Sequence, residues 1–239
     1  LLWNNPAVGS ADFGKNMTEY TAESTKQIDY WITAADTPSE IVEMYADVTG
    51  KAPMMPEFAM GFWQCKLRYA DQEEVLRIAR EYYRRNLPLK VIVIDFFHWP
   101  HQGDWKFDPD YWPNPKAMAD ELHQMGIKLM VSVWPTVEDG SENSQEMIEK
   151  GLLIRSNSGI NYVMGNTRVF DATNPEARQY VWEKCKRNYF DYGVDLFWLD
   201  EAEPEYTAPD FGVYRMYDGS VEECGNEFSR CYAKAFYDG

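Results

Sequence analysis

The sequence contains little of what metal sites, disulfide scaffolds and membrane segments require. Its three histidines and four cysteines are few and scattered, without the spacing of zinc ligands or of a dense disulfide framework. No apolar run is long enough to cross a bilayer, and the chain does not open on a basic segment followed by an apolar one. We therefore expect reduced thiols, no metal and no membrane partner, in either the cytoplasm or the periplasm.

Positive charge is also scarce in this chain. There are 23 Lys and Arg residues against 39 Asp and Glu residues, which gives a net charge of −16 at pH 7. A nucleic-acid partner is not expected, because phosphate binding needs clustered cationic side chains. The composition is otherwise that of a globular protein. Aromatic residues are abundant, and nine Trp and sixteen Tyr suit either a large core or a pocket that stacks against sugar rings.

The N-terminal part of the chain differs from the remainder. Residues 26–33 have the pattern of a strand. Residues 37–40 match a capping box with proline at the first helical position, which predicts a short helix. Two prolines within residues 51–56 then favour an extended connector. We expect a domain boundary here, with residues 1–52 on one side and residues 53–239 on the other.

Strands and helices alternate four times after this boundary. The strands are expected at residues 58–65, 89–94, 128–133 and 194–200, and the helices near Asp71, Asn114, Asn174 and Asn226. Such alternation predicts parallel strands with right-handed crossovers, an α/β fold. Four units are half of a (β/α)8 TIM barrel, and a smaller open sheet is the alternative. We favour half of a barrel, because strands this apolar would leave a bare edge in an open sheet.

Three of the apolar runs lead into a polar or aromatic residue where the strand ends. Asp95, Trp134 and Asp200 would share the carboxyl-terminal rim, which is the catalytic face of a (β/α) barrel. An Asp in such a place can also be a helix cap or a loop anchor, and Asp95 taken alone fits that role. Asp200 is followed closely by Glu203, and different environments can give two neighbouring carboxyl groups different tasks. Glycoside hydrolysis uses two carboxyl groups in this way.

Two long segments interrupt the alternation. Residues 98–115 are too long for a plain βα connection and are rich in Trp, Tyr, His and Asp, side chains that stack on rings and bond hydroxyls. The alternative is a loop that folds over the rim and packs on itself. Residues 138–172 form a second insertion, with a helix expected near 145–150 and a polar turn at 156–159. We interpret this second insertion as mainly structural.

Several motifs follow one another along the chain, and together they are more specific than any one of them. They are Phe62-Trp-Gln, Val91-Ile-Val-Ile-Asp95, Gly103-Asp-Trp-Lys-Phe-Asp-Pro109, Trp112-Pro-Asn-Pro115, Gly126-Ile-Lys-Leu-Met-Val-Ser-Val-Trp-Pro135 and Phe197-Trp-Leu-Asp-Glu-Ala-Glu-Pro204. In this order they resemble glycoside hydrolase family 31, from about residue 26 to the end. The resemblance implies that residues 1–52 are the end of an N-terminal β-sandwich with its linker helix. It implies that residues 53–239 are the first half of the catalytic barrel.

The resemblance also implies roles for individual residues. Asp200 matches the nucleophile, which forms a covalent glycosyl-enzyme intermediate, and Glu203 matches an acidic residue that supports the nucleophile loop. Asp95 matches the substrate-binding Asp at the end of the second barrel strand. The pocket wall would come from four aromatic residues, Trp63, Phe97, Trp134 and Trp198. The family's general acid/base Asp lies in the second half of the barrel, beyond residues 1–239, which alone are therefore expected to be inactive.

The predicted activity is that of a retaining, exo-acting α-glycoside hydrolase. Residues 96–99 and the Met-Val-Ser-Val-Trp-Pro form resemble α-xylosidases, which release terminal α-linked xylose from xyloglucan-type oligosaccharides. The alternatives are an α-glucosidase of the same family and a non-catalytic carbohydrate-binding fragment. No cofactor is implied, because carboxylates do the chemistry. The expected partners are an oligosaccharide and the remaining half of the barrel, from the same parent chain or from a partner, and a homo-oligomer is compatible with the sequence.

Overall fold

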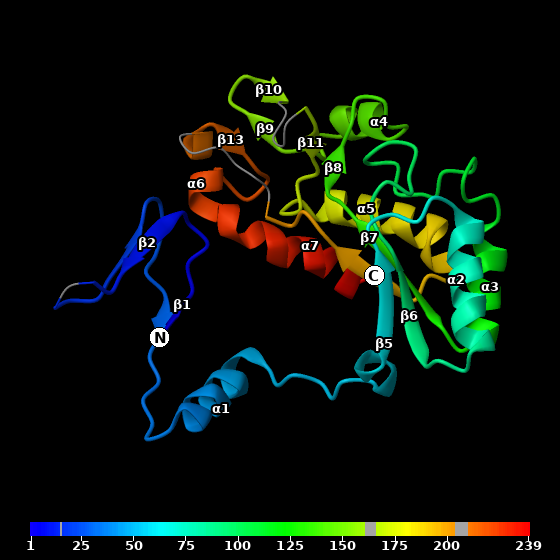
Figure 1. Cartoon of the computed structure of the whole chain (residues 1–239). Coiled ribbons are helices and arrows are strands. Elements are labelled where there is room, and N and C mark those ends of the chain that lie inside the picture. Colours follow the sequence, from blue (N-terminus) through cyan, green and yellow to red (C-terminus); the bar gives the residue numbers. More distant parts are fainter. Residues whose placement is uncertain (15, 161–165, 204–209) are drawn as a thin grey trace.

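A four-stranded parallel sheet forms the centre of the chain, and helices cover one of its faces (Figure 1). The computed structural model describes residues 1–14, 16–160, 166–203 and 210–239. The strands are β5 Phe62–Lys66, β6 Leu89–Ile94, β7 Lys128–Val133 and β12 Leu196–Leu199. They lie in the order β12-β7-β6-β5, and each neighbouring pair is parallel. This is the arrangement predicted for half of a (β/α)8 barrel.

Four helices follow these strands, and side-chain caps fix where three of them begin. They are α2 Gln72–Arg84, α3 Pro115–Gln124, α5 Pro175–Asn188 and α7 Phe228–Tyr237. Asp71, Asn114 and Asn174 each accept a hydrogen bond from a backbone N–H of the first turn, at 2.8, 3.1 and 2.9 Å. Such caps satisfy donors that have no partner within the helix. The capping residues identified in the sequence are therefore confirmed.

Alternation along the strands decides which side chains face the helices. On β6, Ile94 belongs to the core between sheet and helices, so Asp95, one residue further, points to the opposite face. On β7 and β12, Val133 and Leu199 lie in or against the same core. The residues that follow these two strands therefore also point away from the helices. In a closed barrel that face is the interior, and its upper rim is where substrates bind.

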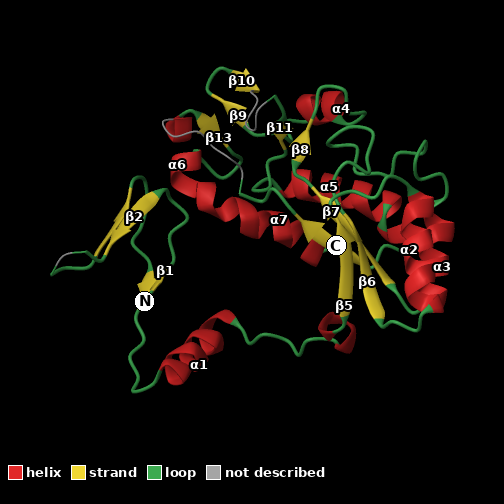
Figure 2. Cartoon of the chain, viewed as in Figure 1, coloured by secondary structure: helices red, strands yellow, loops and turns green. Residues whose placement is uncertain are grey.

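The N-terminal part consists of two small antiparallel pairs and a helix (Figure 2). The strands are β1 Leu2–Trp3, β2 Gly9–Asp12, β3 Glu19–Ala22 and β4 Tyr30–Trp31. β1 pairs with β4, and β2 pairs with β3. The strand predicted at residues 26–33 is wrong in length, because β1 offers it only a two-residue partner.

Helix α1, Pro38–Thr49, begins at the predicted capping box. Glu40 N–H donates to the Thr37 hydroxyl at 3.3 Å, and Thr37 N–H donates to the Glu40 carboxylate at 3.0 Å. None of the residues of this helix is buried. The segment before it touches the barrel part through Asn226, whose side-chain amide donates to the Ala7 carbonyl at 2.9 Å.

The remaining elements are short and lie in the connections. A 3₁₀ turn, η1 Glu57–Met60, occupies the place where the strand predicted at 58–65 was to begin, so that strand starts four residues late. Gly61 ends this turn and lies against the Lys90 side chain, and Phe62 is the first residue of β5. The other short elements are β8 Thr136–Val137, α4 Ser144–Glu149, β9 Arg155–Ser156, β10 Gly159–Ile160, β11 Arg168–Val169, η2 Phe190–Tyr192, η3 Asp210–Gly212, β13 Tyr214–Arg215, α6 Val221–Cys224 and η4 Gly225–Glu227.

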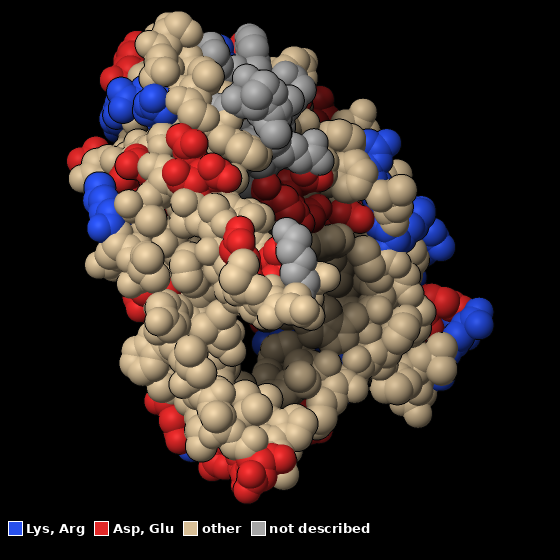
Figure 3. All heavy atoms as spheres, turned by 90° about the vertical axis from the view of Figure 1, so that its left-hand side faces the viewer, with Lys and Arg blue, Asp and Glu red and all other residues tan. Residues whose placement is uncertain are grey.

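The surface reflects the excess of acidic residues. Figure 3 shows Asp and Glu side chains in several groups on one face, with Lys and Arg mostly toward its margins. Within the described parts of the chain, no helix is long and apolar enough to cross a membrane. The four cysteines are free thiols, as the sequence predicted.

The two outer strands of the sheet lead to a prediction about residues 1–239 as an isolated polypeptide. β5 and β12 each pair on one side only within the described chain, and Phe62 on β5 is 50% exposed. Unpaired apolar edges invite pairing with another copy, so we expect oligomers or aggregates in size-exclusion chromatography with light scattering. Phe62→Lys places a charge on one edge and should shift the population toward monomer. A monomeric wild-type polypeptide that unfolds cooperatively would contradict this prediction.

Candidate active site

Three neighbouring strands bring the predicted site residues to one edge of the sheet. Asp95 follows β6, Trp134 follows β7, and Asp200 follows β12. Because β7 lies between β6 and β12, Trp134 stands between the two carboxylates. The pairing continues past the last strand residue, since Asp200 N–H donates to the Val133 carbonyl at 3.0 Å. The ends of β7 and β12 are therefore held level with each other.

Trp134 forms a direct hydrogen bond to Asp200, the predicted nucleophile. Its indole N–H donates to Oδ2 of Asp200 at 3.1 Å. Both side chains are half-buried, so the carboxylate remains accessible from the open side of the sheet. This hydrogen bond fixes the orientation of one oxygen of the Asp200 carboxylate.

Asp95 is buried and belongs to a connected polar group. Its carboxylate accepts from the following N–H, that of Phe96, at 2.8 Å. Its carbonyl lies 2.9 Å from Nδ1 of His98, and Nε2 of His98 lies 2.9 Å from the Tyr189 hydroxyl. A carbonyl can only accept, so Nδ1 carries the proton and the Tyr189 hydroxyl donates to Nε2. Burial lowers the pKa of His98 to about 4, which keeps the ring neutral at physiological pH.

Aromatic rings pack around Trp134 and form one wall of the site. Phe96 stacks on it with ring centres 5.2 Å apart, and Phe97 and Trp99 approach it at 5.8 and 5.7 Å. Phe97 has a φ of +59°, which is unusual for a bulky residue, and its side chain is 48% exposed. Strained backbone of this kind is most common at functional sites. The guanidinium of Arg68 lies 5.3 Å from the ring centre of Phe97.

The other predicted site residues lie nearby but make fewer contacts. Trp63 is half-buried on β5, and its indole N–H is buried without a partner in the described part of the structure. On the same strand, Cys65 is close enough to Asp95 that burial first, and then that carboxylate, raises the pKa of its thiol. Trp198 is half-buried on β12. Trp63 and Trp198 thus lie on the two outer strands of the sheet, β5 and β12.

Glu203 does not join this group in the described structure. Its side chain is exposed, and no hydrogen bond connects it to Asp200 among the residues that the structure describes. Pro204, the last residue of its motif, lies outside the described residues. The supporting role that the family resemblance implies for Glu203 therefore stays a prediction.

Sequence reasoning missed His98 and Tyr189 as parts of the site. His98 lies three residues after Asp95, in a loop that the sequence marked as unusual, but nothing distinguished it from the neighbouring polar residues. Tyr189 is 91 residues further along the chain, and only folding brings it to the imidazole. No sequence pattern available here could have found that pair.

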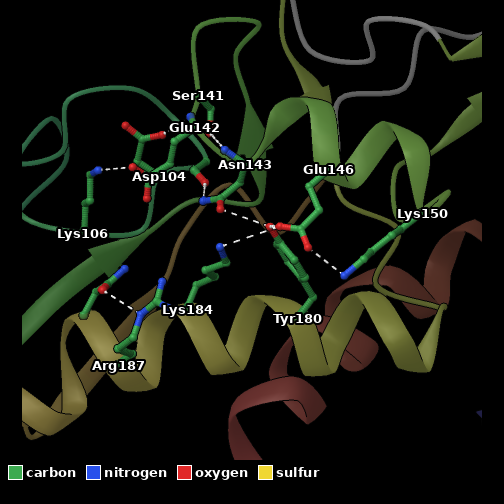
Figure 4. Close-up of polar contacts among 12 residues, drawn as sticks. Asp104, Lys106, Ser141, Glu142, Asn143, Glu146, Lys150, Tyr180, Lys184 and Arg187 are labelled. Atoms are coloured by element: carbon green, nitrogen blue, oxygen red, sulfur yellow. Dashed lines mark hydrogen bonds and ion pairs between the residues drawn. The ribbon is translucent and has the colours of Figure 1, made fainter.

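The two long insertions are locked to each other beside the site (Figure 4). Asn143 is buried, and its side-chain amide donates to the carbonyl of Gly103 at 2.8 Å. The Tyr180 hydroxyl of α5 donates to Glu146 at 2.6 Å and lies 3.1 Å from Oδ1 of Asn143. Glu142 pairs with Lys106 across the same junction. The segment predicted to be mainly structural therefore supports the aromatic loop.

The chemistry available here is that of carboxylates and aromatic rings. Within the described residues no group of three or more His, Cys, Asp or Glu side chains is arranged to hold a metal ion. Two carboxylates at the ends of β6 and β12, on either side of β7, can bind hydroxyls or attack an electrophilic carbon. Aromatic faces beside them suit the C–H surfaces of a sugar ring. This arrangement fits the chemistry expected of a carbohydrate site.

Comparison with known proteins agrees with this description. The family model for the glycosyl hydrolases family 31 TIM-barrel domain matches residues 52–239. The chain is 59% identical over 242 residues to a protein of Pseudescherichia vulneris named uncharacterized family 31 glucosidase ORF2, covering 100% of this chain and 46% of that protein. It is 40% identical over 211 residues to alpha-xylosidase A of Aspergillus niger, covering 85% of this chain and 28% of that protein.

A solved structure gives the same result for the fold. The crystal structure of a GH31 alpha-xylosidase from a soil metagenome, complexed with xylose, matches with a TM-score of 0.93 at 58% identity. The match covers 99% of this chain and 36% of that one, so the chain spans less than half of the length of these relatives. The fold is that of a glycoside hydrolase barrel. The chain belongs to glycoside hydrolase family 31.

The buried imidazole of His98 leads to a prediction about pH and stability. Its pKa is about 4 in the folded protein and near 6.5 in an unfolded chain, so the unfolded state takes up a proton first as the pH falls. Stability is therefore fully present above about pH 6.5 and is lost progressively down to pH 4, by on the order of 3 kcal/mol. Urea unfolding of the full-length protein between pH 7 and pH 4.5 measures this loss.

A matched pair of variants isolates the contribution of His98. In His98→Gln the loss of stability between pH 7 and pH 4.5 should be smaller than in the wild type, because no buried imidazole remains. His101→Gln removes an imidazole whose side chain is 50% exposed, and it should keep the wild-type pH dependence. If both variants follow the wild-type curve, His98 does not control this part of the pH profile.

Proposed function

We propose that this chain supplies the nucleophile half of a retaining, exo-acting α-glycoside hydrolase, most specifically an α-xylosidase. The observation that carries the proposal is the Asp200 carboxylate at the end of β12, oriented by the indole of Trp134 at 3.1 Å. Family membership, the strand-end position and the aromatic wall support the same activity. The substrate class is an oligosaccharide, such as a xyloglucan fragment, with an α-linked xylose at its non-reducing end.

The reaction proceeds by double displacement. The Asp200 carboxylate attacks the anomeric carbon, the bond to the leaving oxygen breaks, and a general acid delivers a proton to that oxygen. Water then attacks the glycosyl-enzyme, the acid now acts as base, and the Asp200 carboxylate leaves with net retention. Asp95, buried at the end of β6, accepts hydrogen bonds from sugar hydroxyls. Glu203 supports the loop that carries the nucleophile.

The second carboxyl group comes from the other half of the barrel. Retaining enzymes hold their two carboxyl groups about 5 to 5.5 Å apart, and we assign the acid to a strand end beyond the four strands described. In this proposal residues 1–52 are the end of a β-sandwich and its linker, and residues 53–239 are the first half of the barrel. The remaining strands come from the same parent chain or from a partner, and a homo-oligomer is compatible with this arrangement.

The preference for xylose over glucose rests on residues 96–99 and on relatives whose names include alpha-xylosidase. An α-glucosidase is the second candidate, because another similar protein is named as a family 31 glucosidase. Xylose lacks the C6 hydroxymethyl group, so a pocket wall that closes against C5 selects it by steric exclusion. The ratio of kcat/KM for p-nitrophenyl α-xyloside and α-glucoside separates the two candidates.

The role of Asp200 is tested by its removal from the full-length protein. Asp200→Ala should lower kcat by about 10⁴-fold or more, because no covalent intermediate can form without the carboxylate. A fluorinated glycosyl donor should trap an adduct on Asp200 of the wild type, identified by peptide mass spectrometry. Asp191→Ala, which removes an exposed carboxylate paired with Lys186, is the matched control and should keep normal turnover. Near-normal activity of Asp200→Ala, or an adduct elsewhere, would sink the assignment.

The role of Asp95 is tested by replacing one of its carboxylate oxygens with an amide nitrogen. Asp95→Asn keeps the shape of the side chain but removes the charge that strengthens its hydrogen bonds to sugar hydroxyls. We expect kcat/KM to fall by roughly 10²-fold or more, about 2.7 kcal/mol, with a contribution from kcat because such bonds tighten in the transition state. Asp120→Asn on the exposed face of α3 serves as control. Unchanged kinetics in a normally folded Asp95→Asn protein would mean that this residue is a loop anchor.

A further inference from the structure

The segment Val133 to Pro135 is held at three successive carbonyl groups. The Val133 carbonyl accepts from the Tyr232 hydroxyl at 2.8 Å, and the Pro135 carbonyl accepts from Phe170 N–H at 3.1 Å. Between them, the Trp134 carbonyl accepts from the indole N–H of Trp105 at 2.9 Å. The donors come from three separate parts of the chain, so the position of Trp134 is set by tertiary contacts.

Trp105 is itself held in an unusual conformation. It is 2% exposed, and its φ of +45° lies in the left-handed region, which is unfavourable for a bulky side chain. Its carbonyl accepts from the side-chain amide of Asn188, the last residue of α5, at 3.1 Å. Residues keep such a conformation when the surrounding contacts impose it, and these contacts most often lie at functional sites. Here the imposed conformation aims the indole N–H at Trp134.

The contacts form one continuous line to the carboxylate. The side-chain amide of Asn188 donates a hydrogen bond to the carbonyl of Trp105. The indole of Trp105 donates one to the carbonyl of Trp134, and the indole of Trp134 donates one to the carboxylate of Asp200. We propose that Trp105 and Asn188 are positioning residues that orient Asp200 through Trp134. The inference rests on the proposed function of Asp200 and adds to it the residues that hold its carboxylate. In the described structure neither residue is hydrogen-bonded to Asp200 itself, so each acts through another residue.

This arrangement predicts an effect on catalysis that is larger than the effect on binding. Reacting groups must be held closely in line, and a displacement of about 1 Å can cost on the order of 10²-fold in rate. Trp105→Phe keeps a ring in the loop but removes the N–H, so Trp134 loses the donor to its carbonyl. We expect kcat of the full-length enzyme to fall about 10-fold, with KM changed less than about threefold. Asn188→Ala should act in the same direction, more weakly.

A double-mutant cycle distinguishes positioning from general structural support. Trp134→Phe removes the indole that bonds Asp200, so in that background Trp105→Phe should lower kcat by less than about twofold. If Trp105 only stabilised the barrel in general, Trp105→Phe would lower kcat by the same factor in the wild-type and in the Trp134→Phe background. Equal decreases of kcat in the two backgrounds would therefore overturn the inference. An unchanged kcat in a folded Trp105→Phe protein would overturn it as well. If Trp105→Phe fails to fold, the same cycle with Asn188→Ala and Trp134→Phe decides by the same criterion.

Matched controls come from the same chain. Trp112→Phe alters another buried Trp in the same loop, whose ring packs on Phe107, and Asn226→Ala removes a comparable amide-to-carbonyl bond, the one to Ala7. Both should leave kcat within about twofold of the wild type. The Asp200→Ala variant is measured alongside them. If it retains turnover, the proposed function fails; if it is inactive while Trp105→Phe is normal, this inference alone fails.

Discussion

The parallel pairing of β6, β7 and β12 is the constraint on which the candidate site depends. Parallel strands end at the same edge of a sheet, and the register aligns Ile94 with Val131 and Leu199 with Val133. Asp95, Trp134 and Asp200 lie along one edge of the sheet only because each follows the last residue of its strand in this register. A shift of one residue in any pair would turn one of these side chains into the helix-covered core.

At that edge of the sheet, each carboxylate of the candidate site has a hydrogen-bond donor. The helix side of the sheet is apolar, whereas the open side carries carboxylates, and a buried charge there needs hydrogen-bond donors. Phe96 N–H supplies one to Asp95, and the indole of Trp134 supplies one to Asp200. His98 is kept neutral by its burial, so it braces the loop after β6 without adding charge beside Asp95. A neutral sugar is a suitable ligand for such a site, because the net charge of −16 does not repel it.

Much of the fold could be predicted from the sequence, and the reasons are local. The β-branched run at Leu89–Ile94 and the caps at Asp71 and Asn174 gave correct elements, because period, caps and prolines act over a few residues. The errors concern the bounds of two strands, which depend on the segments that surround each strand. Residues 26–33 have strand composition, but β4 is limited by the two residues of β1. The start of β5 was misjudged because a 3₁₀ turn precedes it.

The sequence by itself determined the strand-end positions of Asp95, Trp134 and Asp200, since each closes an apolar run, and the motif order determined the family. Only the tertiary structure decided what those side chains contact. Tyr189 reaches His98 across 91 residues, and Trp134 reaches Asp200 across 66. Hydrogen bonds depend on distances of a few tenths of an ångström and on direction, and no residue pattern encodes these before the chain has packed. The local pattern therefore fixed which residues arrive at the rim, and packing fixed how they are held there.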